Sequence, residues 1–101
     1  MRMEIDIPEG LHPDTAQLVK EFAEAMATKL LKSQIKRGYS TEWMEPDRVR
    51  GLKIDFIEHV KKGDPLDCAN YCAFLWKHGA SLDDAQRAYD AHQNYLLRGM
   101  R

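Results

Sequence analysis

The stretch that decides the fold runs from residue 59 to residue 79 and has the sequence HVKKGDPLDCANYCAFLWKHG. Gly63 follows two lysines in this stretch, which is typical of the C-terminus of a helix. Asp64 and Pro65 come next and supply an N-cap and a favoured first residue for a new helix. Residues 68–76 are apolar on most of the circumference of that helix. We therefore expect the helix to lie at the centre of the fold, or to be covered on two sides by a partner subunit.

Similar start and stop signals divide the rest of the chain into three further helices. We expect the first helix over residues 13–36, ended by Gly38, and the second over residues 46–62. The last helix should begin with Ser81 as its N-cap and continue toward the C-terminus. The apolar positions at helical spacing are Val19, Phe22, Met26 and Leu30 in the first helix, Val49, Leu52, Phe56, Ile57 and Val60 in the second, and Leu82, Ala85, Tyr89 and Leu96 in the last.

These elements predict an all-α protein, a compact bundle of about four helices. With 101 residues, the chain has room for one domain, which we place at residues 12–101. Residues 1–11 should form a short extended N-terminal arm or a short strand.

Composition narrows the classes of function. The 15 basic and 16 acidic residues nearly balance, so no overall positive field favours nucleic acid or an anionic membrane. The N-terminus carries acids where a signal peptide has an apolar core, and no run reaches membrane-spanning length. Cys68 and Cys72 lie one helical turn apart, a geometry that favours two free thiols over a disulfide. We expect a soluble cytoplasmic protein without a membrane or nucleic-acid partner.

Carboxylates gather around the turn between the second and third helices. Asp55 and Glu58 are three residues apart before the turn, and Asp64 and Asp67 are three apart after it. Because the short turn makes the two helices antiparallel neighbours, these acids are candidate ligands for a magnesium ion, which prefers oxygen donors. The alternative is that Asp64 and Asp67 only stabilise the start of a helix while the other two acids face water.

Basic and aromatic residues meet at the end of the first helix. Lys29, Lys32 and Lys36 lie along one helix face that continues into Arg37, and such a face can receive phosphate groups. The simpler interpretation is a solvated face that also complements the helix dipole. The following loop, residues 38–43, contains two aromatic side chains and should fold over the core as one wall of a site.

Histidines are the remaining candidates for chemistry. His59 and His78 end the second and third helices, where an imidazole is favoured by the helix dipole and can also act as a general base. A zinc site is disfavoured because Cys68 and Cys72 lack the spacing of a zinc knuckle.

The stretches 36–40 and 59–76, together with Trp43, resemble small phage and prophage proteins of the MazG-like (dATP/dGTP diphosphohydrolase-like) family. The resemblance extends over about residues 12–82. It implies an all-α nucleotide pyrophosphohydrolase that forms homo-oligomers in the bacterial cytoplasm. Such an enzyme uses magnesium to split a nucleoside triphosphate into a monophosphate and pyrophosphate.

The chain departs from the acidic motif of that family. The family carries a Glu-x-x-Glu pair and a Glu-x-x-Asp pair, whereas the nearest matches here are Asp55-x-x-Glu58 and Asp67-x-x-Asn70, separated by a short gap. A protein altered in this way can bind a nucleotide without cleaving it. The alternative class is a non-enzymatic phage accessory or inhibitor protein that binds a host protein or sequesters a nucleotide through an oligomeric helical surface.

Taken together, the residues and the resemblance predict one site. Asp55, Glu58 and Asp67 would face magnesium with help from Asp64. The other roles expected are phosphate binding by Lys36 and Arg37, stacking of a base on Tyr39 or Trp43, and catalysis by His59.

Overall fold

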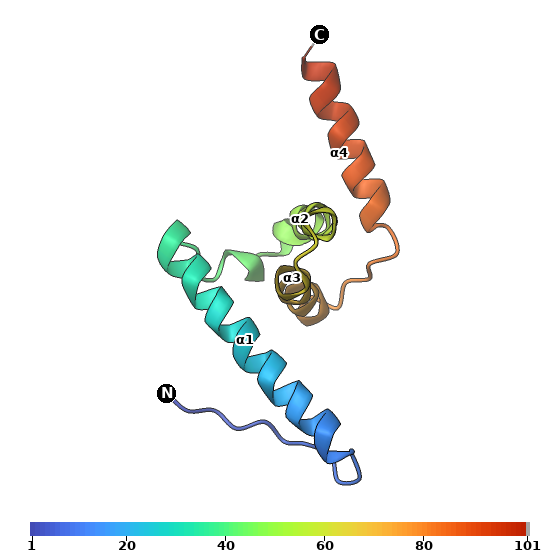
Figure 1. The fold of residues 1–101 in the computed structure, drawn as a ribbon. Coiled ribbons are helices and arrows are strands. Elements are labelled where there is room, and N and C mark those ends of the chain that lie inside the picture. Colours follow the sequence, from blue (N-terminus) through green and yellow to red (C-terminus); the bar gives the residue numbers. More distant parts are fainter. Residues whose placement is uncertain (101) are drawn as a thin grey trace.

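The computed structural model describes residues 1–100, and all regular structure in this range is helical (Figure 1). The predicted all-α class with four helices is confirmed. The α-helices are α1 (Pro13–Arg37), α2 (Val49–Lys62), α3 (Pro65–Lys77) and α4 (Ala85–Gly99), and two 3-10 turns, η1 (Glu42–Met44) and η2 (Pro46–Arg48), connect α1 to α2.

The centre of the fold is the antiparallel pair α2 and α3, which Figure 1 shows almost end-on. Gly63 ends α2 in the left-handed conformation at φ 85°, and its backbone N–H donates to the carbonyls of His59 and Val60. One residue later the Asp64 carboxylate accepts a hydrogen bond of 2.9 Å from the Leu66 backbone N–H and caps α3. The predicted stop and start are therefore both confirmed.

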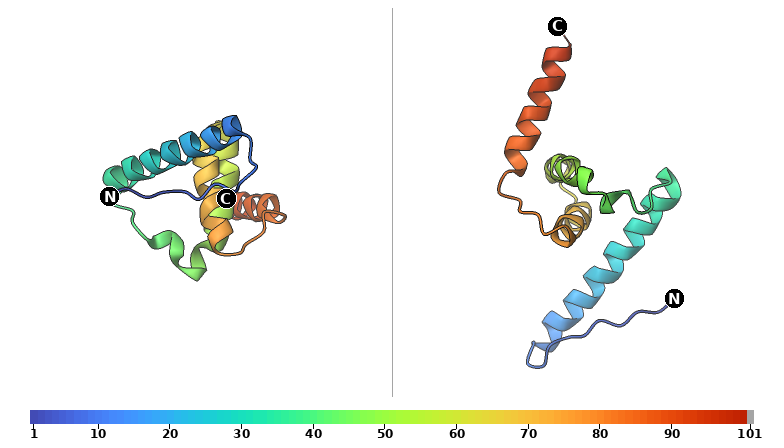
Figure 2. Two further views of the ribbon diagram at one scale, coloured as in Figure 1. Left: turned by 90° about the horizontal axis from the view of Figure 1, so that it is seen from below. Right: turned by 180° about the vertical axis from the view of Figure 1, so that it is seen from behind.

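The outer helices cover the pair from different sides, with α1 against α3 and α4 against α2 (Figures 1 and 2). Among residues 1–100, three apolar side chains are buried, Leu52 in α2, Leu75 in α3 and Ala85 at the start of α4. The core therefore lies where α2, α3 and the beginning of α4 meet. This agrees with the central position predicted for the apolar helix over residues 68–76.

Helix boundaries differ from prediction in two places. The first turn of the second helix, residues 46–48, is a 3-10 turn. The last helix begins at Ala85 rather than directly after Ser81. The Ser81 hydroxyl accepts a hydrogen bond from the Asp83 backbone N–H, but the chain then forms a separate turn in which the Ala85 N–H donates to the Leu82 carbonyl. Asp84 then fixes the start of α4 by pairing with Lys53 of α2, at 2.6 Å between Nζ and Oδ1.

The N-terminal arm contains no strand or helix in residues 1–8, and a turn at Glu9 and Gly10 leads into α1. His12 caps α1, since its Nδ1 accepts a hydrogen bond of 3.1 Å from the Asp14 backbone N–H. Both cysteines are free thiols, as expected.

Candidate functional site

A groove lies between α1, the 3-10 segment and the faces of α2 and α3. It comprises a larger space of about 870 Å³ and a smaller one of about 230 Å³, which we treat as one groove because they share five lining residues. The smaller space is lined by Lys29, Lys32, Ser33, Lys36, Arg37, His59, Asp67 and Tyr71. The larger space is lined by Leu30, Ser33, Gln34, Arg37, Tyr39, Ser40, Glu42, Trp43, Glu45, Asp47, Arg48, Leu52, Asp55, Glu58, His59, Lys62, Asp67, Asn70, Tyr71 and Phe74.

One wall of the groove is basic. Lys32, Lys36 and Arg37 come from the last turns of α1, and Arg37 lines both spaces. The same side chains that complement the dipole of α1 thus also border a cavity, so the two interpretations of the basic stripe are compatible. The groove joins this basic wall to the aromatic loop that follows α1.

A second wall of the groove, the aromatic wall, consists of Trp43, whose ring is packed against α3, and Tyr39, whose ring is exposed. Trp43 stacks on Phe74 of α3, with ring centroids 5.1 Å apart and an angle of 16° between the planes. The imidazole Nε2 of His78 lies 2.5 Å from the Trp43 carbonyl oxygen, which ties the loop to the end of α3. Tyr39 keeps 58% of its surface exposed. His78 therefore holds the loop in place, and Tyr39 is the aromatic ring left open to a ligand.

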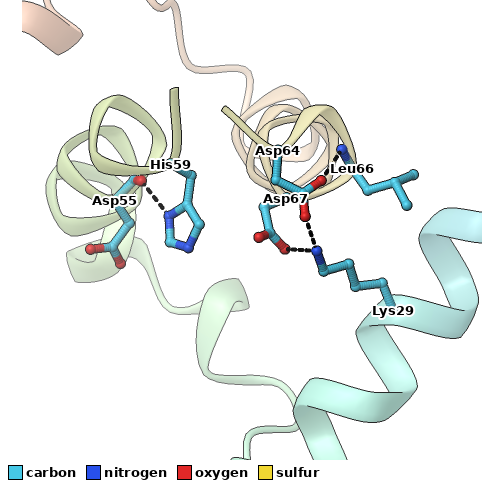
Figure 3. A network of polar contacts seen from close by, with 6 residues as sticks. All are labelled: Lys29, Asp55, His59, Asp64, Leu66 and Asp67. Atoms are coloured by element: carbon cyan, nitrogen blue, oxygen red, sulfur yellow. Dashed lines mark hydrogen bonds and ion pairs between the residues drawn. The ribbon is translucent and has the colours of Figure 1, made fainter. Parts of the chain in front are cut away.

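Lys29 of α1 takes part in an ion-pair network with two acids of α3 (Figure 3). Its ammonium group pairs with the Asp64 carboxylate and lies 3.2 Å from Oδ1 of Asp67. The hydrogen bond from Lys29 lowers the pKa of Asp64, with a further contribution from the Leu66 backbone N–H, and the same bond raises the pKa of Lys29. An internal cation thus already pairs with both acids and offsets one of their two negative charges.

The four predicted metal ligands do not form one cluster. Asp55, Glu58 and Asp67 line the larger space, whereas Asp64 caps α3 and lines neither space. Among residues 1–100, no three side chains of histidine, cysteine, aspartate or glutamate are grouped closely enough to hold a metal ion. Magnesium binding by these acids would therefore require that the ligands come closer together and that the ion compete with Lys29 for Asp67.

Asp55 is a half-buried carboxylate in the groove. Burial is the main cause that raises the pKa of Asp55, and the charges of Arg48 and His59 act against it. A half-buried acid in a cavity with a raised pKa is typical of functional sites, because the charged form is less stable there than in water.

Replacing Asp55 with asparagine is expected to stabilise the protein at neutral pH. The raised pKa means that folding favours the protonated carboxyl, so stability is lost as the pH rises through the pKa of Asp55 in the folded state. Asparagine keeps the size of the side chain without the charge. We expect Asp55→Asn to raise Tm by a few degrees at pH 7, a shift that about 1 kcal/mol produces in a domain of this length.

The gain should disappear about one pH unit or more below about 3.9, the ordinary pKa of an aspartate, where the carboxyl is protonated in both the folded and the unfolded state. Asp83→Asn is the control, because Asp83 is exposed and lies outside the groove. An equal Tm for Asp55→Asn and wild type at pH 7 would contradict the burial argument. Thermal unfolding followed by circular dichroism measures both effects.

Asn70 stands at the position where the acidic motif of the MazG-like family has its fourth acidic residue. It is only 5% exposed, it lines the larger space, and its side-chain Oδ1 has no hydrogen-bond partner among residues 1–100. A buried acceptor without a partner is unfavourable, so a donor from water or from a ligand is expected there. Its position makes Asn70 a stronger candidate for ligand binding than its sequence alone suggested.

The His59 side chain extends from α2 on the side that faces α3, as Figure 3 shows. Its Nδ1 is 2.8 Å from the Asp55 carbonyl oxygen, and its ring lies 4.8 Å from that of Tyr71. When Nδ1–H donates this bond, Nε2 is the acceptor, which is the form that a general base requires.

Sequence reasoning missed Arg48 and Tyr71, which also line the groove. Tyr71 lies within the apolar run, so nothing local marked it as a site residue.

Comparison with protein-family models, with curated proteins and with solved structures finds no match to this chain. Among residues 1–100, no helix combines the length and apolar character that crossing a bilayer requires. The geometry of the groove is therefore the basis for the functional argument.

Proposed function

We propose that this protein binds a nucleoside triphosphate in the groove, the class of ligand implied by its resemblance to MazG-like pyrophosphohydrolases. The observation that carries the proposal is that the basic end of α1 and the aromatic loop border one cavity. A nucleotide needs both features, cations for its phosphates and a flat ring for its base.

The phosphates belong at the basic wall. Lys36 and Arg37 would contact them, and Lys32 lies on the same wall. The Arg37 guanidinium can hold two phosphate oxygens at once, which a lysine cannot do. The base would lie against the exposed ring of Tyr39 and beside Trp43, which line the larger space together with Arg37. A cavity of about 870 Å³ is within the usual range of ligand sites.

Magnesium-dependent hydrolysis to a monophosphate and pyrophosphate is the second candidate. It is favoured because Asp55, Glu58, Asp67 and Asn70, the counterparts of the family's acidic motif, all line the same cavity as the basic and aromatic walls. The ion pair between Lys29 and Asp67 argues against hydrolysis, because a magnesium ion bound by Asp67 would have to compete with the Lys29 ammonium group. Binding without cleavage is therefore the function that this geometry supports best.

The first experiment measures nucleotide binding and pyrophosphate release together. The wild-type chain is titrated with deoxynucleoside and ribonucleoside triphosphates, with and without magnesium, and product is assayed in the same samples. We expect saturable binding without magnesium. Magnesium-dependent release of pyrophosphate that Asp67→Asn abolishes would show that the protein is also a hydrolase.

Failure to bind any nucleotide would contradict the proposal. The alternative class, an accessory or inhibitor protein that binds a host protein, would then be favoured. Circular dichroism of Asp67→Asn confirms that the variant is folded, so that a loss of activity reports on the site. A nucleotide ligand and two free thiols both accord with the bacterial cytoplasm, where we place the protein.

A further inference from the structure

Asn70 is the polar side chain that the fold buries most deeply among residues 1–100, with 5% of its surface exposed. It lines the larger space of the groove, and its Oδ1 accepts no hydrogen bond from any group in the described part of the chain. A buried acceptor that lacks a donor destabilises the fold. Such a group in the wall of a cavity therefore calls for a donor that the cavity receives.

The position of Asn70 along α3 indicates which part of a nucleotide would supply this donor. Asp67, one turn earlier, borders the smaller space with its lysines and lies 3.2 Å from the Lys29 ammonium group. Phe74, one turn later, stacks on the ring of Trp43. Residues three and four apart share a helix face and are separated along the axis by about 4.5 and 6 Å. Asn70 therefore lies between the part of the groove suited to phosphates and the part suited to a base.

The chemistry of Oδ1 excludes the phosphates as its partner. Phosphate oxygens are acceptors at neutral pH, and two acceptors cannot form a hydrogen bond with each other. The sugar connects the phosphates to the base, and a ribose hydroxyl can act as a donor. The terminal amide of an asparagine turns easily about its last bond, so Oδ1 can face a hydroxyl that enters the groove.

We propose that Asn70 determines specificity for the sugar of the bound nucleotide, because its Oδ1 accepts a hydrogen bond from the hydroxyl at C2′ or C3′. This inference rests on the proposed function and adds the part of the ligand that the middle of the groove selects. A site that hydrogen-bonds a hydroxyl discriminates against a ligand without it, because the buried group of the protein is then left without a partner.

The test compares four triphosphates of one base that carry ribose, 2′-deoxyribose, 3′-deoxyribose or 2′,3′-dideoxyribose. Isothermal titration calorimetry gives their affinities for the wild-type chain. Because the base and the phosphates are constant, any difference reports on the sugar. We expect the dideoxy compound to bind about tenfold more weakly than the ribonucleotide. A loss already seen with the 2′-deoxy compound assigns the bond to the 2′ hydroxyl, and a loss seen with the 3′-deoxy compound assigns it to the 3′ hydroxyl.

Asn70→Leu removes the acceptor and keeps a side chain of similar size. This variant should bind all four triphosphates with affinities within about twofold of one another. The matched control is Asn94→Leu, the same change at an exposed position of α4 outside the groove, which should keep the wild-type preference. Circular dichroism shows whether both variants are folded, and the wild-type series decides the question if Asn70→Leu is not.

Equal affinities of the wild-type chain for the four sugars would overturn this proposal and leave nucleotide binding intact. A sugar preference that a folded Asn70→Leu variant retains would overturn it as well, since another group would then hold the hydroxyl. If the wild-type chain binds no nucleotide at all, the proposed function fails, and the assignment of Asn70 fails with it.

Discussion

Leu75→Ala is expected to lower the free energy of unfolding by about 3 kcal/mol, a larger effect on stability than that of the other variants proposed. Leu75 is 1% exposed and is the largest fully buried side chain among the residues that the structure describes. Alanine would leave a cavity at the junction of α2, α3 and α4, where few other side chains can compensate. Since small domains are stable by only 5 to 15 kcal/mol, a large part of the total would be lost. Urea unfolding followed by circular dichroism measures the change.

Leu31→Ala is the matched control, because Leu31 is the same residue type on α1 but is 53% exposed. Its effect should be within about 1 kcal/mol. Equal losses in the two variants would show that α3 is not the centre of the core.

Arg37→Ala is expected to weaken nucleotide binding by ten- to a hundredfold, the largest effect expected on function. Hydrogen bonds to charged groups contribute about 1.5 to 3 kcal/mol, and Arg37 lines both spaces of the groove at the end of α1. The loss should be largest for triphosphates and smaller for monophosphates, because the side chain would contact phosphate rather than base. Isothermal titration calorimetry measures the affinities.

Lys20→Ala provides the control for charge, because Lys20 is an exposed cation of α1 outside the groove. The affinity of the Lys20→Ala variant for nucleotides should stay close to that of the wild-type chain. If both variants bind equally well, the phosphates do not lie at the basic wall. If both lose affinity equally, binding depends on overall charge rather than on this site.

Part of the candidate site was predictable because its signals are local. The end of α1 collects basic residues for its dipole, and the aromatic loop follows directly, so Lys36, Arg37 and Trp43 were identifiable from neighbouring positions alone. The carboxylates on both sides of the short turn were predictable for the same reason. Sequence reasoning did not anticipate the pairing of Lys29 with Asp64, which joins residues 35 positions apart and changes what those acids can bind.

The sequence by itself determined the helices and the turn between α2 and α3. Gly63, Asp64 and Pro65 act through backbone conformation and hydrogen bonds within a few residues, so their effect does not depend on the rest of the fold. The tertiary structure decided which polar groups meet. The contacts of Lys53 with Asp84 and of His78 with Trp43 bridge 31 and 35 residues, and Asn70 is buried only because of how the helices pack. Distant partners such as these depend on the packing of complete helices, which no local pattern of residues encodes.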